Sequence, residues 1–191
     1  MTLAEIEQKL FDNNPDYLAD LGGTGLGKLA PFVESAVLAM QKRDWISVGL
    51  RGQSVAALRG ASTANIGNGS SNYKIAPSIG TPAARALQSI GLAKSSDRPV
   101  LCLMGNAALG DGQLFEALNL AVLHSASVIF VVLERDTSKM PIAKSTAVSI
   151  DVIALTLGLK SNTVTDAESL GKAVSSSRET GAPTLIRATI Q

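Results

Sequence analysis

Apolar and polar positions follow one another along the chain in blocks that predict two kinds of element. Apolar-rich runs that predict strands lie at 45–49, 100–104, 127–133 and 184–189, and near Thr163. Segments that predict helices lie at 3–11, 31–42, 54–58, 82–94, 113–124, 148–157 and 166–176. Continuous apolar runs joined by helices are typical of parallel strands that are buried on both faces. The pattern therefore predicts a three-layer α/β fold, with a mostly parallel sheet between two layers of helices.

Capping residues mark several of the predicted helix starts. Thr2 and Glu5 have the spacing of a capping box in front of the first helix. Thr81 and Pro82 supply an N-cap and a first-turn proline, and Asp111 is the predicted N-cap of the helix that follows it. Residues 60–78 are rich in Gly, Ser, Asn and Ala and have no periodicity, which predicts a long and functional loop.

The length of the chain, 191 residues, suffices for one domain with a substantial core. No internal repeat and no linker-like segment divides the sequence, so we expect residues 1–191 to form a single domain. Because 46% of the residues are hydrophobic and only 4% are aromatic, the core must be aliphatic and alanine-rich. So apolar a chain is also expected to cover part of its surface with a partner.

Charge and composition exclude several classes of function. A formal net charge of +1 does not provide the basic excess that nucleic-acid binding requires. The apolar stretch 125–133 is too short to cross a membrane. The first residues show no basic region followed by an apolar run, so we expect no secretory leader and a cytoplasmic location. Cys102 and His124 occur once each, and both are predicted to be structural.

Two strand ends carry the candidate site, because ligands of parallel sheets bind at the carboxyl ends of the strands. The first end is the small-residue turn Gly105, Asn106, Ala107 and Ala108, where backbone N–H groups can face an anion. The second end is 134–137, with the sequence Glu-Arg-Asp-Thr, after the next strand.

This strand–helix–strand unit resembles the thiamine-diphosphate motif of transketolases and of the E1 components of 2-oxo acid dehydrogenases. The family pattern is Gly-Asp-Gly, about 26 residues, then Asn-Asn. When residues 115–119 (Phe-Glu-Ala-Leu-Asn) are aligned with the family, its Gly-Asp-Gly falls on residues 105–107. Its Asn-Asn then falls on Glu134 and Arg135. The literal Gly-Asp-Gly at 110–112 is not the motif, because Lys139 and Met140 lie 26 residues further on.

The resemblance covers residues 20 to 190. Three further segments are similar to segments of the family: the glycine-rich residues 22–25, the turn 78–80 (Ser-Ile-Gly), and the last strand with the Gly-Ala-Pro at 181–183 before it. Residues 43–49 resemble the transketolase segment that ends in Ser-x-Gly-His, but Leu50 replaces the histidine. The resemblance implies that thiamine diphosphate contacts Ile79, Gly80, Gly105, Asn106, Ala107, Ala108, Glu134, Arg135 and Thr137.

In the resembled families the motif's Asp and second Asn ligate Mg²⁺, which implies Asn106 as the metal ligand here. Arg135 has no acceptor atom and cannot coordinate a cation. Three alternatives follow. The metal is retained through Asn106 with Glu134 or Asp136, or Arg135 replaces the metal and binds a phosphate in a bidentate manner. In the third alternative the site is inactive and Arg135 pairs with a nearby carboxylate.

The resemblance implies a small subunit of a split transketolase- or E1-like enzyme. Such a subunit would transfer a two-carbon or acyl unit from a ketose or 2-oxo acid. No catalytic acid or base is assigned to this chain, because the glutamate that acts on the cofactor belongs to a pyrimidine-binding domain. We therefore expect a hetero-oligomer with a pyrimidine-binding chain, of α2β2 type, or a homodimer.

Two other hypotheses remain open at the level of sequence. The altered positions 50, 106 and 135 favour a catalytically inactive paralogue that scaffolds or regulates an active thiamine-diphosphate enzyme. A nucleotide- or phosphate-binding α/β module is compatible with the glycine turns. That module has less support, because the sequence contains neither a Gly-x-Gly-x-x-Gly strand–helix junction nor a Walker lysine.

Overall fold

The computed structural model describes residues 1–13, 26–49, 52–62, 69–77, 80–135 and 148–190. Its centre is a five-stranded sheet with the order β1-β2-β3-β5-β4, in which every neighbouring pair of strands is parallel. The strands are β1 (Trp45–Ser47), β2 (Val100–Gly105), β3 (Val128–Arg135), β4 (Lys160–Val164) and β5 (Thr184–Ile190). The α/β fold with a parallel sheet that the sequence predicts is therefore confirmed.

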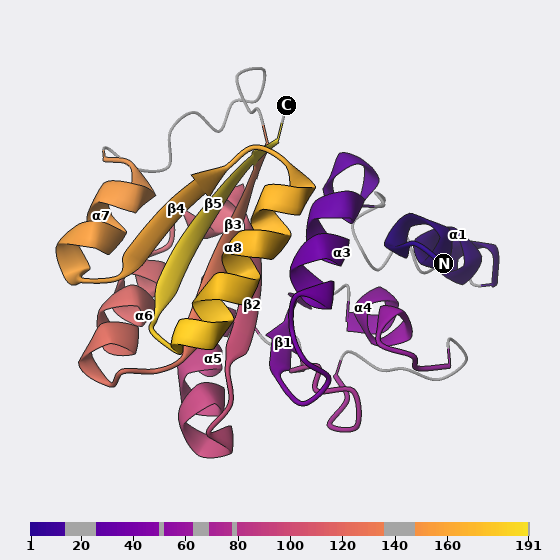
Figure 1. Cartoon of the computed structure of the whole chain (residues 1–191), viewed down its shortest axis with the longest axis horizontal. Coiled ribbons are helices and arrows are strands. Elements are labelled where there is room, and N and C mark those ends of the chain that lie inside the picture. Colours follow the sequence, from indigo (N-terminus) through magenta and orange to yellow (C-terminus); the bar gives the residue numbers. More distant parts are fainter. Residues whose placement is uncertain (14–25, 50–51, 63–68, 78–79, 136–147, 191) are drawn as a thin grey trace.

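Helices cover both faces of this sheet (Figure 1). One face is packed by α3 (Ala30–Leu38), α4 (Gly52–Leu58) and α8 (Ala167–Thr180), with α1 (Leu3–Asn13) outside α3 and α4. The other face is packed by α5 (Pro82–Ser96), α6 (Gly112–Leu123) and α7 (Ile150–Leu157). Two 3₁₀ turns, η1 (Gly27–Leu29) and η3 (Asn106–Ala108), precede α3 and follow β2.

The apolar strand runs are buried on both sides because successive side chains point to opposite faces. In β2, Leu101 and Leu103 belong to the core under α3 and α8, whereas Cys102 and Met104 belong to the core under α5 and α6. Cys102 is a fully buried small hydrophobe, as predicted, and burial raises the pKa of its thiol. His124 is exposed and is the C-cap residue of α6.

The predicted caps are present. Thr2 N–H donates to Glu5 at 2.8 Å and Glu5 N–H donates to the Thr2 hydroxyl at 3.3 Å, which is a reciprocal capping box. Thr81 accepts from Ala84 N–H, and Asp111 accepts from Gln113 N–H at the start of α6. The predicted helix 31–42 is shorter than expected and ends at Leu38, whereas α8 extends four residues beyond 176, to Thr180.

The first described helices after β1 and β2 pack on opposite faces of the sheet, although the connection from β1 returns to β2 through α5 on the α6 face. The next described helix after β1 is α4, which packs on the α3 and α8 face, whereas β2 leads to α6 on the α5 face. Ligands of open α/β sheets bind where neighbouring strands diverge in this way, outside their carboxyl ends. The fold therefore directs attention to the carboxyl edge between β1 and β2.

At the opposite, amino edge of the sheet the buried Asp44 and the half-buried Arg59 both have partners within the protein. The Asp44 side chain, 1% exposed, accepts from Arg178 Nε at 2.7 Å and from Gln41 N–H at 2.9 Å. Arg59 donates from Nη1 to the carbonyl oxygens of Asp44 and Tyr73, at 2.9 and 3.0 Å, and from Nη2 to that of Gln41. These bonds tie α3, α4, α8 and the start of β1 together.

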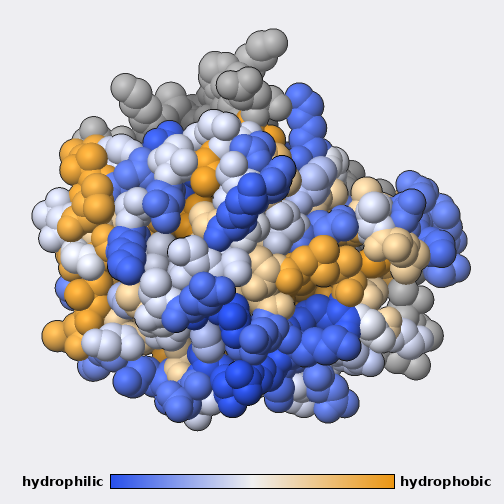
Figure 2. All heavy atoms as spheres, viewed as in Figure 1, coloured by the Kyte–Doolittle hydropathy of each residue, from blue (hydrophilic) through white to orange (hydrophobic). Residues whose placement is uncertain are grey.

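The outer surface of α7 is the most apolar part of the view in Figure 2. Val152 and Leu155 on this helix are 52% and 59% exposed, and Val148 in front of it is 49% exposed. Among the described residues, none of the helices combines the length and hydropathy needed to pass through a bilayer.

Candidate functional site

The turn after β2 brings small residues to the carboxyl edge. Gly105 ends the strand, and η3 follows immediately, with Leu109 N–H donating to the Asn106 carbonyl at 3.0 Å. Gly105 and Ala107 are exposed, whereas Ala108 is buried against the α5 and α6 core. The backbone of this turn is therefore accessible to a ligand in the way the sequence predicts.

Asn106 fastens the end of β2 to the end of β3. Its Oδ1 accepts from Arg135 N–H at 3.0 Å and its Nδ2 donates to the Arg135 carbonyl at 3.2 Å. This pair of bonds needs one acceptor and one donor, which an amide provides and an ionised carboxylate does not. We call this arrangement the Asn106 clasp. Asn at this position thus has a structural explanation that does not involve a metal.

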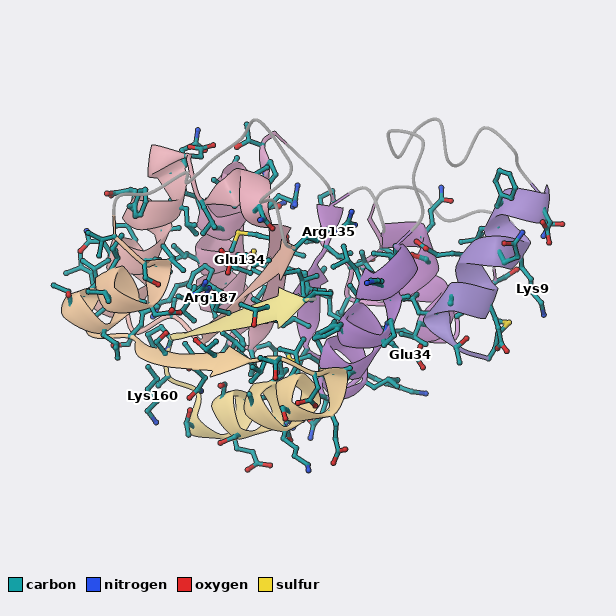
Figure 3. The ribbon with its side chains drawn as sticks, turned by 90° about the horizontal axis from the view of Figure 1, so that it is seen from above. Lys9, Glu34, Glu134, Arg135, Lys160 and Arg187 are labelled. Atoms are coloured by element: carbon teal, nitrogen blue, oxygen red, sulfur yellow. The ribbon has the colours of Figure 1, made fainter. Side chains whose placement is uncertain are left out.

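Glu134 takes part in a separate charge network on the α7 side of the sheet. It pairs with Arg187 Nε of β5, and Arg187 Nη1 also donates to Asp151 at 3.1 Å (Figure 3). The Ser149 hydroxyl donates to the same Asp151 oxygen at 2.9 Å. The hydrogen bond to Glu134 raises the pKa of the Arg187 guanidinium. The carboxylate of Glu134 is thereby engaged within the protein.

Arg135 is exposed at the tip of β3 (Figure 3). Its backbone is held by the Asn106 clasp, but its guanidinium forms no ion pair with the carboxylates of the described residues. The sequence-level alternative in which Arg135 pairs with a nearby carboxylate therefore finds no support in the described part of the chain. A positive charge remains available beside the turn 105–108.

The starts of α5 and α6 are joined at the same edge. The Thr81 hydroxyl donates to Asp111 Oδ2 at 2.9 Å, so the two N-cap residues contact each other. Gly80, which precedes Thr81, has a φ of +59°, a left-handed conformation that favours glycine. Ile79, Thr137, Leu50, Ser78, Asp136 and residues 22–25 lie outside the described residues, so their predicted roles stay predictions.

Sequence reasoning missed Arg85, which lies one turn into α5. A Cβ built on Gly49, just beyond β1, would lie 2.8 Å from Arg85 Cζ, so the guanidinium lies directly against the Gly49 backbone. Its Nε is buried and has no hydrogen-bond partner. Burial lowers the pKa of this guanidinium, and the buried thiol of Cys102 lies nearby. The available signal was one charged residue next to the alanines on the buried face of an apolar helix.

The comparisons with known proteins agree with this geometry. Residues 51–135, from before α4 to the end of β3, match the family model described as dehydrogenase E1 component. No curated protein sequence matches the chain. Among solved structures, a protein described as a thiamin diphosphate-dependent enzyme from Mycobacterium smegmatis is 16% identical with a TM-score of 0.61. The match covers 82% of this chain and 30% of that one.

Two decarboxylases give similar results. Benzoylformate decarboxylase from Polynucleobacter necessarius is 16% identical with a TM-score of 0.61, covering 84% of this chain and 32% of that one. A thiamine diphosphate-dependent 4-hydroxybenzoylformate decarboxylase from Rhodococcus jostii is 20% identical with a TM-score of 0.59, covering 82% and 31%. The chain thus spans about a third of the length of the structures it matches.

At these identities the structural matches show the fold, which is the α/β fold of a domain of thiamine-diphosphate-dependent enzymes. The dehydrogenase E1 match, which runs from before α4 to the end of β3, agrees with this resemblance to thiamine-diphosphate-dependent enzymes. The resemblance that the sequence indicates is confirmed at this level.

A divalent cation does not fit the described residues of the site. Hard cations need oxygen ligands, preferably carboxylates. Asn106 Oδ1 already accepts a hydrogen bond, the Glu134 carboxylate pairs with Arg187, and Arg135 offers only donors. No group of three potential ligands that could hold a metal ion occurs in the described part of the chain. The diphosphate of the cofactor fits better, because the exposed turn 105–108 and the guanidinium of Arg135 are both suited to an anion.

Proposed function

We propose that this chain forms the diphosphate-binding part of a thiamine-diphosphate-dependent enzyme. The enzyme would transfer a two-carbon or acyl unit from a ketose or a 2-oxo acid. The observation that carries the proposal is the accessible turn Gly105–Ala108, which ends β2 at the edge where the first described helices after β1 and β2 pack on opposite faces of the sheet. This turn lies within the region that matches the E1 family model. The 2-oxo acid decarboxylases of similar fold make a 2-oxo acid the first substrate class to test.

Each residue of the site would contribute binding and orientation. The exposed backbone of Gly105 and Ala107 would approach the diphosphate closely, and Arg135 would supply positive charge in a bidentate geometry. The contact between Thr81 and Asp111 would hold the starts of α5 and α6 in fixed positions, with Gly80 beside them. Thiamine diphosphate, when bound, supplies a nucleophilic carbon for attack on the substrate carbonyl. Proton transfer is not assigned to the described residues.

The pyrimidine half of the site would come from another domain, which we propose to be a pyrimidine-binding chain in a hetero-oligomer. The resemblance supports this arrangement, and the exposed apolar side chains on α7 offer one surface for such a contact. A homodimer is the alternative assembly. Size-exclusion chromatography with light scattering, on the chain alone and with a pyrimidine-binding chain, would distinguish the two.

A second candidate function is that of a catalytically inactive paralogue that scaffolds an active enzyme. The specific observation in its favour is that the two oxygen-bearing side chains of the aligned motif, Asn106 and Glu134, are both engaged within the protein, while Arg135 at the second ligand position offers only donors. A domain retained for its fold and its contacts would keep these bonds and would have no need of a cation.

Calorimetric titration with thiamine diphosphate would decide between the two candidates. It would be done with Mg²⁺ and with EDTA, on the chain alone and mixed with a pyrimidine-binding chain. Binding in EDTA that weakens about tenfold in Arg135→Gln and less in Arg135→Lys would support the enzyme with an arginine-held diphosphate. Binding that needs Mg²⁺ would support a retained metal. If no condition gives binding, the cofactor role is wrong and the scaffolding function stands.

A further inference from the structure

Arg85 is a charged side chain in a place where charged side chains are usually paired. No hydrogen bond or ion pair joins its guanidinium to any described residue, and its Nε is completely shielded from solvent. The side chain as a whole is half-buried, with its guanidinium packed against the backbone of Gly49. Gly49 has a φ of +71° and lacks the Cβ that would occupy the same space. The local backbone thus makes room for a guanidinium that the described protein does not satisfy.

This arrangement is unfavourable unless something else supplies the missing acceptor. Moving a charged or polar group out of water without a hydrogen bond in return destabilises the folded protein. Burial is the main reason why the pKa of Arg85 is lowered. A guanidinium nevertheless remains protonated at neutral pH, so it cannot avoid the penalty by losing its proton. The buried Nε therefore lacks an acceptor, and an anion placed against the guanidinium would supply one.

A second polar group in the same layer is also without a nitrogen or oxygen partner among the described residues. Ser47 is 1% exposed and lies on β1 two residues before Gly49. Its hydroxyl has no such partner, and a polar neighbour is the weakly bonding thiol of Cys102, whose pKa it lowers. Both Ser47 and Arg85 lie beside the buried Cys102 thiol, since both affect its pKa. On α5, the Ser89 hydroxyl one turn after Arg85 is satisfied, because it donates to the Arg85 carbonyl at 2.8 Å. The unsatisfied donors are therefore on the Arg85 and Ser47 side chains, between α5 and β1.

The position of these groups agrees with where a ligand would enter. Gly49 follows the end of β1, and the turn Gly105–Ala108 follows the end of the neighbouring strand β2. These are the two strands after which the first described helices pack on opposite faces of the sheet, which is the usual ligand position in such folds. Arg85 approaches from the β1 side of the turn, whereas Arg135 lies at the end of β3 on its other side.

We propose that Arg85 binds an oxyanion group, a phosphate or a carboxylate, of a ligand held at the carboxyl edge of β1 and β2. Its guanidinium supplies the positive charge, without a divalent cation, and Ser47 is the second donor of the same site. Only the identity of the molecule that carries the oxyanion, cofactor or substrate, rests on the proposed function. A phosphate would come from the cofactor, and a carboxylate would come from a 2-oxo acid substrate.

The test compares four proteins: wild type, Arg85→Met, Arg85→Lys and Arg43→Met. Arg43 is exposed near the amino edge, so its replacement removes the same charge far from the site. Each protein is titrated calorimetrically in EDTA with pyrophosphate, with thiamine diphosphate and with pyruvate. We expect at least one oxyanion to bind wild type and Arg43→Met alike. Its affinity should fall about 10- to 100-fold in Arg85→Met, with an intermediate loss in Arg85→Lys.

Thermal denaturation without ligand is the second measurement. The melting temperature of Arg85→Met should differ according to whether Arg85 has a ligand-binding role or a purely structural one. Methionine keeps most of the length of the side chain and removes an unsatisfied charge. Arg85→Met should therefore melt at the wild-type temperature or about 2 °C or more above it, and should lose the rise in melting temperature that the oxyanion causes in wild type. A lower melting temperature of Arg85→Met would mean that the guanidinium is satisfied within the protein, and would overturn the proposal.

The ligands separate this proposal from the proposed function. If thiamine diphosphate binds wild type and Arg85→Met equally well, and pyrophosphate and pyruvate also fail to distinguish the two proteins, the role of Arg85 is wrong and the cofactor-binding function stands. If pyruvate binds through Arg85 and thiamine diphosphate does not bind, the oxyanion site stands and the cofactor role fails. If none of the three ligands binds wild type more tightly than Arg85→Met, the oxyanion site is refuted.

Discussion

Two half-buried arginines, Arg59 and Arg85, lie at opposite edges of the sheet. They differ in whether the described protein supplies hydrogen-bond acceptors for their guanidinium groups. Burial lowers the pKa of both guanidinium groups. Arg59, near the amino edge, donates hydrogen bonds to three backbone carbonyls. Arg85, near the carboxyl edge, has no partner among the described residues, and its Nε is buried.

The difference separates groups that serve folding from groups that are available to a ligand. The amino edge also contains the buried Asp44–Arg178 pair, so this buried carboxylate is satisfied from within the chain. At the carboxyl edge, Asn106 and Glu134 are likewise engaged internally, while Arg85 and Arg135 remain. The free energy spent on desolvating Arg85 is therefore evidence of a use beyond stability.

The largest effect is expected from breaking the buried ion pair of the amino edge. Arg178→Met would leave the Asp44 carboxylate, 1% exposed, with one backbone N–H as its remaining partner. We expect a loss of about 3 kcal/mol in the free energy of unfolding, measured by urea denaturation. Arg178→Lys, which keeps the charge, should lose less. A loss below about 1 kcal/mol in Arg178→Met would show that solvent reaches this pair.

Arg59→Met should come next and tests the comparison directly. It removes the Arg59 donor from three carbonyl oxygens, of which that of Gln41 still accepts from Asp44 N–H at 3.0 Å, so the free energy of unfolding should fall by about 2 kcal/mol. The matched Arg85→Met should cause no loss. Equal destabilisation in the two variants would show that the two arginines are held in the same way, and the contrast between the edges would be wrong.

Gly49→Ala should have a smaller effect, because it combines backbone strain with displacement of a flexible side chain. A φ of +71° disfavours alanine, and the new Cβ would require Arg85 to move. We expect a loss of about 1.5 kcal/mol by urea denaturation. Gly27→Ala is the control, since Gly27 also has a positive φ, +51°, but open space around it. If Arg85 is firmly placed, Gly49→Ala should be the more destabilising of the two, and adding Arg85→Met should reduce the difference.

Asn106→Asp should give the smallest change, about 1 kcal/mol, because one of the two bonds of the clasp is kept. The second carboxylate oxygen would face the Arg135 carbonyl, which disfavours the ionised form and raises the pKa of the introduced carboxyl above its usual value of about 3.9. The protonated form can donate to that carbonyl. Stability relative to wild type should therefore be best below about pH 4 and decline as the pH rises through the raised pKa.

Thermal denaturation of Asn106→Asp between pH 3 and 8 would measure this dependence. Addition of Mg²⁺ should leave the melting temperature of wild type unchanged, since the described donor atoms do not fit a divalent cation. A Mg²⁺-dependent rise in wild type would show that the metal ligands of the resembled families are functionally retained.

Most of the fold could be predicted from the sequence because local patterns and tertiary packing agree. The apolar runs of β2 and β3 are buried on both faces, and the capping residues Thr2, Thr81 and Asp111 start helices where expected. Disagreements are confined to the ends of elements, including strands: β1 stops at Ser47 instead of 49, and β3 continues to Arg135 instead of 133. The helix α3 stops at Leu38, and α8 continues to Thr180, where Gly181 adopts a left-handed conformation with a φ of +65°.

The site was less accessible to sequence reasoning because its chemistry depends on contacts between distant residues. Alignment with the motif drew attention to Asn106, Glu134 and Arg135, whose cofactor role stays a prediction. The spacing did not reveal the Asn106 clasp or the pairing of Glu134 with Arg187, 53 residues away. Arg85 belongs to no motif. Its significance depends on the groups around its guanidinium, and a sequence pattern does not show that a hydrogen-bond acceptor is missing there.

The order of strands in the sheet has a consequence for how the chain folds. The fourth strand in sequence, β4, pairs only with β5 among the described residues, and β5 lies between it and β3. During synthesis β4 therefore has no neighbour among the described strands until residues 184–190 have left the ribosome, and α7 and α8 lack their contacts with β5 until then. Interrupted synthesis would expose unpaired edges of β3 and β4, which are prone to aggregation. Completion of this domain thus waits for its last strand.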